Sequence, residues 1–313
     1  MNAVAAASPE WPYGAVVVRA VMPIGVGYGL SGSVYRVEAD AQHGLISFVL
    51  KREGAEATER ALEFHRLVGP SVEGAIPTLL GGAVDEEGGI GVLLLEDVAP
   101  AVQGDALVPC TDAEALAAVR TLAHVHAVRP EADAGPRWRP RVLSPDEWAA
   151  RLDAAVRRFP WVAAHELGDV PMRARRGVAA LDAGPEAWIH GDVHLDNVLF
   201  RPDGRAVLLD WSAPVVGPSA VDLARLLTEG VNAGARGELA GALVDAYADE
   251  LAARGVTLDR DALGKELAAA LVLLVQTAIA WAGREEAREP VERIRALQEN
   301  LLRSALSWAS KRA

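Results

Sequence analysis

Residues 190–200 read His-Gly-Asp-Val-His-Leu-Asp-Asn-Val-Leu-Phe, and residues 207–211 read Val-Leu-Leu-Asp-Trp. They contain Asp192, an asparagine five residues later at Asn197, and a further aspartate at Asp210, thirteen residues beyond Asn197. Phosphoryl transfer needs this combination, because one carboxylate orients a hydroxyl nucleophile while a carboxamide and another carboxylate hold magnesium on the ATP phosphates. The intervening Arg-Pro-Asp-Gly-Arg turn lies between two apolar runs and predicts a short hairpin. Such a hairpin would bring Asn197 and Asp210 to one metal ion.

The same segment resembles the catalytic loop of the aminoglycoside phosphotransferase and choline kinase-like family. Its members carry His-Gly-Asp, an asparagine five residues after the aspartate, and a later aspartate at a strand end. The matching residues are His190, Asp192, Asn197 and Asp210. The resemblance implies that Asp192, His190 and Asn197 are the catalytic residues, with Asp192 as the catalytic carboxylate, and that Asn197 and Asp210 bind Mg²⁺. It also implies an α+β, bilobal protein-kinase-like fold with a small β-rich N-terminal lobe and a larger helical C-terminal lobe.

Two other readings of the segment fit less well. Eukaryotic protein kinases have arginine at the position of Gly191 and Asp-Phe-Gly at residues 210–212, and here no Ala-Pro-Glu follows. We therefore expect a small-molecule acceptor. Residues 191–194, Gly-Asp-Val-His, also match the opening of a two-metal phosphoesterase motif. Such sites need further ligands downstream, and none of the seven histidines follows His194.

The composition excludes several classes of function. The 313 residues are 51% hydrophobic, which suffices for one large domain or two smaller lobes. A net charge of −12 argues against nucleic acid as a partner and is compatible with a cationic small molecule. The only cysteine, Cys110, excludes an intramolecular disulfide. Residues 1–14 show no signal-peptide pattern, and the apolar run 267–282, interrupted by Gln276, reads as a buried helix. We expect a cytoplasmic protein, monomer or homodimer, without membrane contact.

The pattern of the first 98 residues differs from that of the rest. Residues 1–98 hold short β-rich runs and glycines, whereas residues 99–313 hold long helical patterns. We expect an N-terminal nucleotide-binding lobe over 1–98 and a helical lobe with the catalytic loop and substrate pocket over 99–313. The glycines of residues 25–33 stand between two predicted strands, where backbone amides can approach phosphates. The resemblance places nucleotide contacts at Gly29, Ser31, Gly32 and Ser33.

Lys51 is the only lysine among the first 264 residues, and it ends a predicted strand over 45–50. The resemblance assigns its ammonium to the α- and β-phosphates of ATP, with GTP as an alternative donor. Residues 56–68 read as a helix in which Glu59 and Glu63 lie one turn apart on one face. One of them should pair with Lys51, and the family pattern favours Glu59.

The strand predicted over 90–95 leads into Glu96 and Val98, which correspond to the family's hinge, where adenine pairs with backbone groups. The resemblance also covers residues 217–224. It implies that Asp222 accepts hydrogen bonds from backbone amides of the catalytic loop.

Helix-capping patterns start at Thr111 and Ser144, each of which precedes a glutamate by three residues. His124 and His126 fall in the first of these helices, where they point about 200° apart and so cannot bind one metal from one face. We expect them to be core or surface histidines. Further helices are predicted over 236–254, 259–283 and 290–311.

The activity that the resemblance implies is transfer of the γ-phosphate of ATP to a hydroxyl of a small molecule. An aminoglycoside or another antibiotic is the leading expectation for the acceptor. A metabolic kinase of an amino alcohol, sugar or thiosugar would carry the same motifs. A catalytically silent nucleotide-binding module is disfavoured, because Lys51, Asp192, Asn197 and Asp210 are all present.

Overall fold

The computed structural model gives the chain as two compact units. Unit 1 consists of Met1–Val102 and Leu199–Pro214, and unit 2 of Gln103–Val198 and Val215–Ala313. The residues described are 9–25, 33–182, 184–230, 236–284 and 291–310. A single division at residue 98, as expected from composition, leaves Leu199–Pro214 with the helical part, whereas this segment packs with the first unit.

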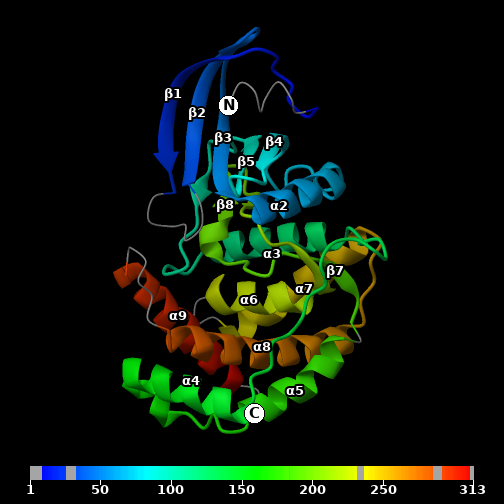
Figure 1. Ribbon diagram of the computed structural model, residues 1–313. Coiled ribbons are helices and arrows are strands. Elements are labelled where there is room, and N and C mark those ends of the chain that lie inside the picture. The colour runs from blue at the N-terminus through cyan, green and yellow to red at the C-terminus, as the bar shows by residue number, and fades with distance from the viewer. Residues whose placement is uncertain (1–8, 26–32, 183, 231–235, 285–290, 311–313) are drawn as a thin grey trace. The chain divides into compact units, whose positions relative to one another are not determined.

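Unit 1 is built on a five-stranded antiparallel sheet with the order β1-β2-β3-β5-β4 (Figure 1). Its strands are β1 (Val17–Ile24), β2 (Ser33–Ala41), β3 (Gly44–Gly54), β4 (Leu79–Asp85) and β5 (Ile90–Glu96). Apolar side chains alternate along the strands, so that one face is buried. Val37, Phe48 and Leu94 on that face are fully buried. The strands predicted from the sequence are present, with shifted or longer ends.

Helix α2 (Ala55–Leu67) follows β3 directly and packs against β4 and β5. Leu62 of the helix and Leu93 of β5 belong to one buried apolar cluster. The approach is so close that a Cβ added at Gly91 would lie 2.1 Å from Thr58 Oγ1. A larger side chain there would push the helix away, so glycine fixes the distance between α2 and the sheet.

The hairpin predicted around the turn at residues 201–205 is confirmed. A small sheet of order β6-β8-β9 consists of β6 (Val102–Gln103), β8 (Val198–Phe200) and β9 (Ala206–Leu208). In the turn, Gly204 has a φ of 82°, which glycine adopts without strain. The return strand ends at Leu208, two residues before Asp210, whereas a strand over 206–209 was expected to deliver Asp210 directly at its end.

The segment that carries Asp210 is attached firmly to the rest of unit 1. Leu208 N–H donates to the carbonyl oxygen of Ala75 at 2.8 Å. The ring of Trp211 stacks on that of Phe64 of α2, with ring centroids 4.2 Å apart. Backbone and aromatic contacts thus fix both sides of Asp210.

Unit 2 is mostly helical. Its longer helices are α3 (Asp112–His126), α4 (Pro145–Arg158), α5 (Val170–Leu181), α6 (Ala220–Gly230), α7 (Arg236–Ala253), α8 (Arg260–Ala282) and α9 (Val291–Ser310). Short strands β7 (Glu186–Ile189) and β10 (Val215–Pro218) pair antiparallel. The short 3₁₀ helices of the chain are η1 (Gly69–Ser71), η2 (Pro160–Ala164) and η3 (Leu195–Asn197). The predicted capping boxes at Thr111 and Ser144 begin α3 and α4.

Helix α8 packs against α4, α5, α6 and α9 (Figure 1). By length and composition alone it could cross a membrane, since its most apolar window has a mean hydropathy of 1.6. However, 67% of that window is buried inside the protein, and the buried Gln276 side chain accepts a hydrogen bond from Leu143 N at 3.0 Å. These are the contacts of a core helix, as predicted.

Candidate functional site

The His-Gly-Asp motif follows directly on the buried strand β7, whose Ile189 pairs with Val215 of β10. Asp222, in the first turn of α6, is fully buried. Its carboxylate accepts hydrogen bonds from His190 N at 2.6 Å and Gly191 N at 2.9 Å. Gly191 has a φ of 78°, which favours glycine. The predicted role of Asp222 as support of the loop is confirmed.

Two further buried groups hold Asp222. His126 Nε2 lies 3.3 Å from Asp222 Oδ2, and His126 Nδ1 lies 2.7 Å from the hydroxyl of Tyr247. Burial raises the pKa of Tyr247, so its hydroxyl stays protonated and can donate to Nδ1, which leaves Nε2 to donate to the carboxylate. His126 is thus a core histidine, one of the two readings expected. Its link to Asp222 was missed, because the two residues lie 96 positions apart.

Asp192 presents an open carboxylate between the side chains of Arg225 and His194. Its side chain is 65% exposed, with Arg225 Nη2 3.3 Å from Oδ1 and His194 Nε2 3.6 Å from Oδ2. Glu229, one turn further along α6, pairs with Arg225 and anchors it. Partial burial opposes ionisation, but the hydrogen bond from His194 and the charge of Arg225 outweigh it and hold the pKa of Asp192 well below its usual range. The group is therefore ionised at neutral pH.

Arg225 and Glu229 were not anticipated from the sequence. Arg225 follows Asp222 by three residues, which is less than one helical turn, so it lies near the face of α6 that supports the catalytic loop. That spacing is the signal that could have found it. The same cluster raises the pKa of His194: burial alone would lower it, but the hydrogen bond to Asp192 and the nearby Glu229 outweigh that effect.

Asn197 closes the catalytic loop. Its side-chain nitrogen Nδ2 donates to the backbone carbonyl of Asp192 at 3.1 Å, and its backbone N–H donates to His194 O at 2.9 Å. Because Nδ2 is engaged, the oxygen Oδ1 is the atom available to a hard cation. His190, which is buried, accepts a hydrogen bond at Nδ1 from Asp192 N at 3.3 Å. His190 therefore supports the loop from within.

Asp196, next to Asn197, ties the loop to more distant parts of unit 2. Its buried carboxylate accepts a hydrogen bond from Ala106 N at 2.7 Å. Arg293 of α9 contacts the same carboxylate at 2.9 Å and Asp105 at 3.0 Å. The loop is thus held by α6, by residues near the start of unit 2, and by the last helix.

In unit 1, Lys51 lies inside β3, three residues before its end, and not at a strand end as expected. Its side chain is 8% exposed. The ammonium lies 2.8 Å from Glu53 Oε2, and it also contacts Asp210 and Ser212. Ser212 Oγ lies 2.7 Å from Glu53 Oε2 and 2.5 Å from Asp210 Oδ1. Asp210 has a φ of 60°, a left-handed conformation that is uncommon outside glycine and frequent at functional sites.

The expected partner of Lys51 was wrong. Glu59 and Glu63 are both exposed, and the carboxylates that pair with Lys51 are those of Glu53 and Asp210. β3 continues to Gly54, and α2 begins at Ala55, one residue before its predicted start; the helix is oriented with Glu59 and Glu63 exposed. Glu53 was missed, although its position two residues after Lys51 puts both side chains on one face of the strand.

Of the other residues expected to bind nucleotide, Ser33 and Glu96 lie at strand ends of the same sheet. Glu96 ends β5, and its carboxylate accepts hydrogen bonds from Thr78 Oγ1 at 2.8 Å and Arg201 Nη2 at 3.1 Å. Val98 is buried, and Ser33 is the exposed first residue of β2. Gly29, Ser31 and Gly32 lie outside the described residues.

The expected metal site needs few protein ligands. Among the described residues, no group of three or more His, Cys, Asp or Glu side chains could hold a metal ion. Magnesium is typically bound by one or two protein groups, with phosphate and water oxygens completing its coordination. The carboxylate of Asp210, 34% exposed, and Oδ1 of Asn197 fit this requirement chemically. They belong to different units, so their sharing of one ion stays a prediction.

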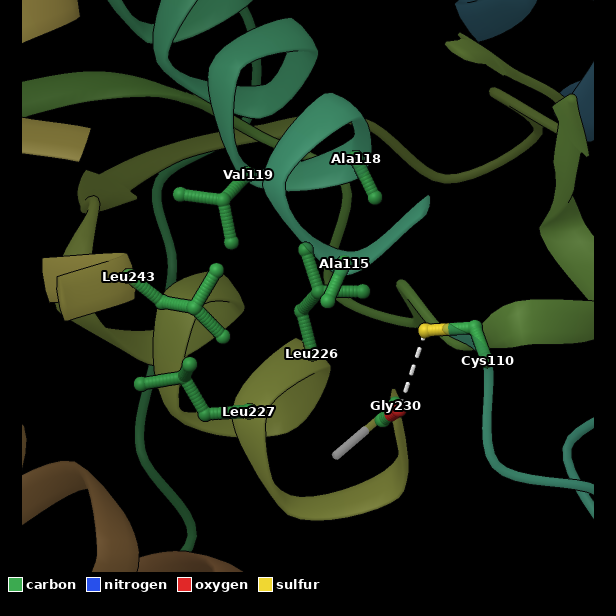
Figure 2. A pocket seen from close by; sticks show the side chains of 8 residues that line it. All are labelled: Cys110, Ala115, Ala118, Val119, Leu226, Leu227, Gly230 and Leu243. Carbon is green, nitrogen blue, oxygen red and sulfur yellow. Dashed lines mark hydrogen bonds between the residues drawn. The ribbon is translucent and has the colours of Figure 1, made fainter. Parts of the chain in front are cut away.

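A small apolar cavity in unit 2 does not serve as a substrate site (Figure 2). Its volume is about 10 Å³, which is room for one water molecule at most. Its lining residues are Cys110, Ala115, Ala118, Val119, Leu226, Leu227, Gly230 and Leu243. Burial raises the pKa of Cys110 to about 11, so the thiol stays protonated and donates to Gly230 O at 3.0 Å (Figure 2). Cys110 is a packing residue here.

Comparison with known proteins identifies the family of the chain and its fold. The chain matches the sequence model described as "Phosphotransferase enzyme family" over residues 24–258, which is three quarters of its length. No curated protein matches it.

Several solved structures share the fold. The spectinomycin phosphotransferase APH(9)-Ia, in complex with ADP and spectinomycin, has a TM-score of 0.61 and 14% identity, over 95% of this chain and 94% of its own. Choline kinase LicA from Streptococcus pneumoniae has a TM-score of 0.52 and 16% identity, over 91% and 93%. Macrolide 2′-phosphotransferase MphH from Brachybacterium faecium, as apoenzyme, has a TM-score of 0.53 and 19% identity, over 91% and 93%. The expected protein-kinase-like α+β fold is thereby confirmed.

Proposed function

Because the chain belongs to the phosphotransferase enzyme family, we propose that it transfers the γ-phosphate of ATP to a hydroxyl group of a small molecule. Family membership makes it a small-molecule phosphotransferase. The donor, the metal, the acceptor and the roles of individual residues are the proposal. GTP is kept as an alternative donor.

The observation that carries the proposal is the state of Asp192. Its carboxylate is ionised, largely exposed, and mounted on a loop that the buried Asp222 fixes. A carboxylate with a low pKa is a weak base, but phosphoryl transfer through a loose transition state demands mainly orientation of the nucleophile. Asp192 would accept a hydrogen bond from the acceptor hydroxyl and take its proton as the new P–O bond forms.

The remaining assignments concern the nucleotide. Asn197 and Asp210 would hold Mg²⁺, which supplies charge neutralisation on the phosphate oxygens when bound. Lys51 would contact the α- and β-phosphates. The backbone around Gly29, Ser31, Gly32 and Ser33 would approach the phosphates, and that of Glu96 and Val98 the adenine base. His190 would contribute to catalysis by supporting the loop that carries Asp192.

The acceptor is proposed to be a hydroxylated, cationic antibiotic. The similar structures include a spectinomycin phosphotransferase and a macrolide 2′-phosphotransferase, and a net charge of −12 would concentrate a cation around the protein. A second candidate is a metabolic kinase of an amino alcohol, because a choline kinase shares the fold. In either case we place the protein in the cytoplasm, where its substrate ATP is made.

The test is a phosphotransfer screen with ATP and GTP over hydroxylated antibiotics, amino alcohols and sugars, read as ADP or GDP formation and as phosphorylated product in the mass spectrum. Wild type is compared with Asp192→Asn in each reaction, and in a susceptible bacterium exposed to the same antibiotics. Phosphorylation of amino alcohols or sugars only would establish the metabolic kinase. Nucleotide binding without transfer to any acceptor would favour a silent module, and ester hydrolysis without nucleotide would favour a phosphoesterase.

A further inference from the structure

Lys51 is a buried cation with two very different carboxylate partners. Its ammonium contacts Glu53 and Asp210. The side chain of Glu53 is 3% exposed, whereas that of Asp210 is 34% exposed. A buried ammonium needs a partner that stays in place, because an isolated charge in the interior is strongly disfavoured. A carboxylate proposed to bind a metal cannot serve as that permanent partner, and Glu53 can.

The geometry of β3 explains why Glu53 reaches the ammonium. Side chains alternate along a strand, so Lys51 and Glu53 lie on one face while Arg52, between them, is exposed on the other. Glu53 Oε2 lies 2.8 Å from Lys51 Nζ and 2.7 Å from Ser212 Oγ. Its second oxygen, Oε1, is buried and has no hydrogen-bond partner among the described residues, so Glu53 retains capacity for one more donor.

Helix α2 brings no carboxylate to this place. Its glutamates Glu56, Glu59 and Glu63 are all exposed. The titratable residue on its buried face is His65. Burial, and then the charge of Lys51, lowers the pKa of His65 to about 4. The imidazole is therefore neutral at physiological pH and does not balance the ammonium charge.

We propose that Glu53, and not a carboxylate of α2, is the residue that positions Lys51 for the nucleotide phosphates, with Ser212 bridging Glu53 and Asp210. The inference rests on the proposed function in one respect, which is that Lys51 binds phosphate. Glu53, on the same strand as Lys51, balances the charge of the ammonium and orients it. The hydroxyl of Ser212 has one proton and donates it either to Glu53 or to Asp210. Asp210 is thereby left available to the metal.

The experiment compares the affinity of the full-length protein for ADP with Mg²⁺ and for adenosine, measured by isothermal titration calorimetry. Glu53→Gln is expected to raise the Kd of ADP about tenfold, the size of losing one charge-assisted contact. The Kd of adenosine should change less than about twofold, because adenosine has no phosphate for Lys51. Ser212→Ala is expected to raise the Kd of ADP by a smaller factor, about threefold. The matched control is Glu56→Gln, which should leave both affinities unchanged.

Each result decides the matter. Loss of ADP affinity in Glu59→Gln or Glu63→Gln, with Glu53→Gln unaffected, would overturn the proposal in favour of a helix carboxylate. Equal weakening of ADP and adenosine in Glu53→Gln would show that Glu53 acts only through the structure of the lobe. If Glu53→Gln does not fold, Ser212→Ala decides, and unchanged ADP affinity there overturns the proposal. If the wild-type protein binds adenosine and ADP equally well, Lys51 does not bind phosphate, and the further inference fails while the proposed function stands. If the wild-type protein binds neither, the proposed function fails as well.

Discussion

The charge cluster around Lys51 in unit 1 and the one around Asp192 in unit 2 share one arrangement, in which a buried cation pairs with a buried glutamate and with a more exposed aspartate. In unit 1 the cation is the fixed member: Lys51 is 8% exposed and anchored by the buried Glu53. In unit 2 the cation is again the fixed member, since Arg225 is 14% exposed and anchored by the buried Glu229.

In each cluster the exposed member is an aspartate. Asp210 is 34% exposed and Asp192 is 65% exposed. A buried cation–glutamate pair thus contacts an aspartate in both units and leaves the carboxylate of that aspartate partly exposed to solvent. The difference lies in backbone geometry, because Asp210 itself takes a φ of 60° while in the catalytic loop the glycine before Asp192 takes the positive φ. We infer that the open aspartates are the groups offered to ligands.

The largest effect is expected from the open aspartate of unit 1. Asp210→Ala should lower phosphotransfer roughly a thousandfold, the scale of losing a contact that stabilises transition-state charge. It should also remove the magnesium dependence of ADP binding, while Lys51 keeps its pairing with Glu53. Calorimetric titration of ADP with and without Mg²⁺ measures this. An unchanged magnesium dependence would show that Asp210 is not a metal ligand. The two clusters would then share a geometry but not a function.

The open aspartate of unit 2 is expected to act on turnover alone. Asp192→Asn should lower kcat on the order of a hundredfold or more, because the amide orients the acceptor hydroxyl poorly and takes no proton. The Kd of ADP should stay within about twofold of wild type, since Asp192 is not assigned to the nucleotide. Steady-state kinetics with the acceptor found in the screen gives kcat, and near-normal turnover would remove Asp192 from the mechanism.

The two clusters differ in how their histidines, His65 and His194, change the stability of the protein with pH. The pKa of His65 is lowered to about 4 by burial and by Lys51, whereas that of His194 is raised by Asp192 against the effect of burial. Below an unfolded-state pKa of about 6.5, unfolding is favoured by protonation of His65, so its contribution to stability falls as pH drops from about 6.5 towards 4. The contribution of His194 has the opposite sign: it is full below about 6.5 and is lost as pH rises through its higher folded pKa.

The effect of His65, in unit 1, on the free energy of unfolding can be measured. Between pH 7.5 and pH 5, His65 should reduce the free energy of unfolding by about 2 kcal/mol, from the linkage of a folded pKa of about 4 to an unfolded one of about 6.5. His65→Leu should lack this loss, and urea unfolding at both pH values measures it. As control, His194→Gln should keep the acid loss caused by His65. Equal acid sensitivity of His65→Leu and wild type would mean that His65 is not buried in neutral form.

What the sequence could predict about these clusters was local. The spacing of His190, Asp192 and Asn197 is set by the chemistry of one loop, and the hairpin to Asp210 by one turn. Both could be expected without knowledge of the fold. Asp222 could be expected from the family resemblance, and its hydrogen bonds to the loop amides confirm it.

The sequence could not predict the ion pairs that depend on how whole helices are oriented and placed. The start of α2 was predicted to within one residue, but the helix is oriented with Glu59 exposed, and the carboxylate at the ammonium is that of Glu53. Arg225 and Asp192 are 33 positions apart and meet only because α6 supports the catalytic loop. The orientation of α2 and the placement of α6 do not follow from a local pattern, since packing decides them.

The smallest effect is expected from the cation beside Asp192. Replacing Arg225 alone would leave Glu229 buried without a partner, which is itself destabilising, so the informative variant is the double change Arg225→Met with Glu229→Gln. It should lower kcat about tenfold, the order of one lost charge-assisted contact to the catalytic carboxylate, with the KM for ATP unchanged. Glu229→Gln alone should have less effect, because the contact between Arg225 and Asp192 remains. If the double variant instead raises the KM for ATP at constant kcat, Arg225 acts on the nucleotide, and the buried cations of the two clusters share one function.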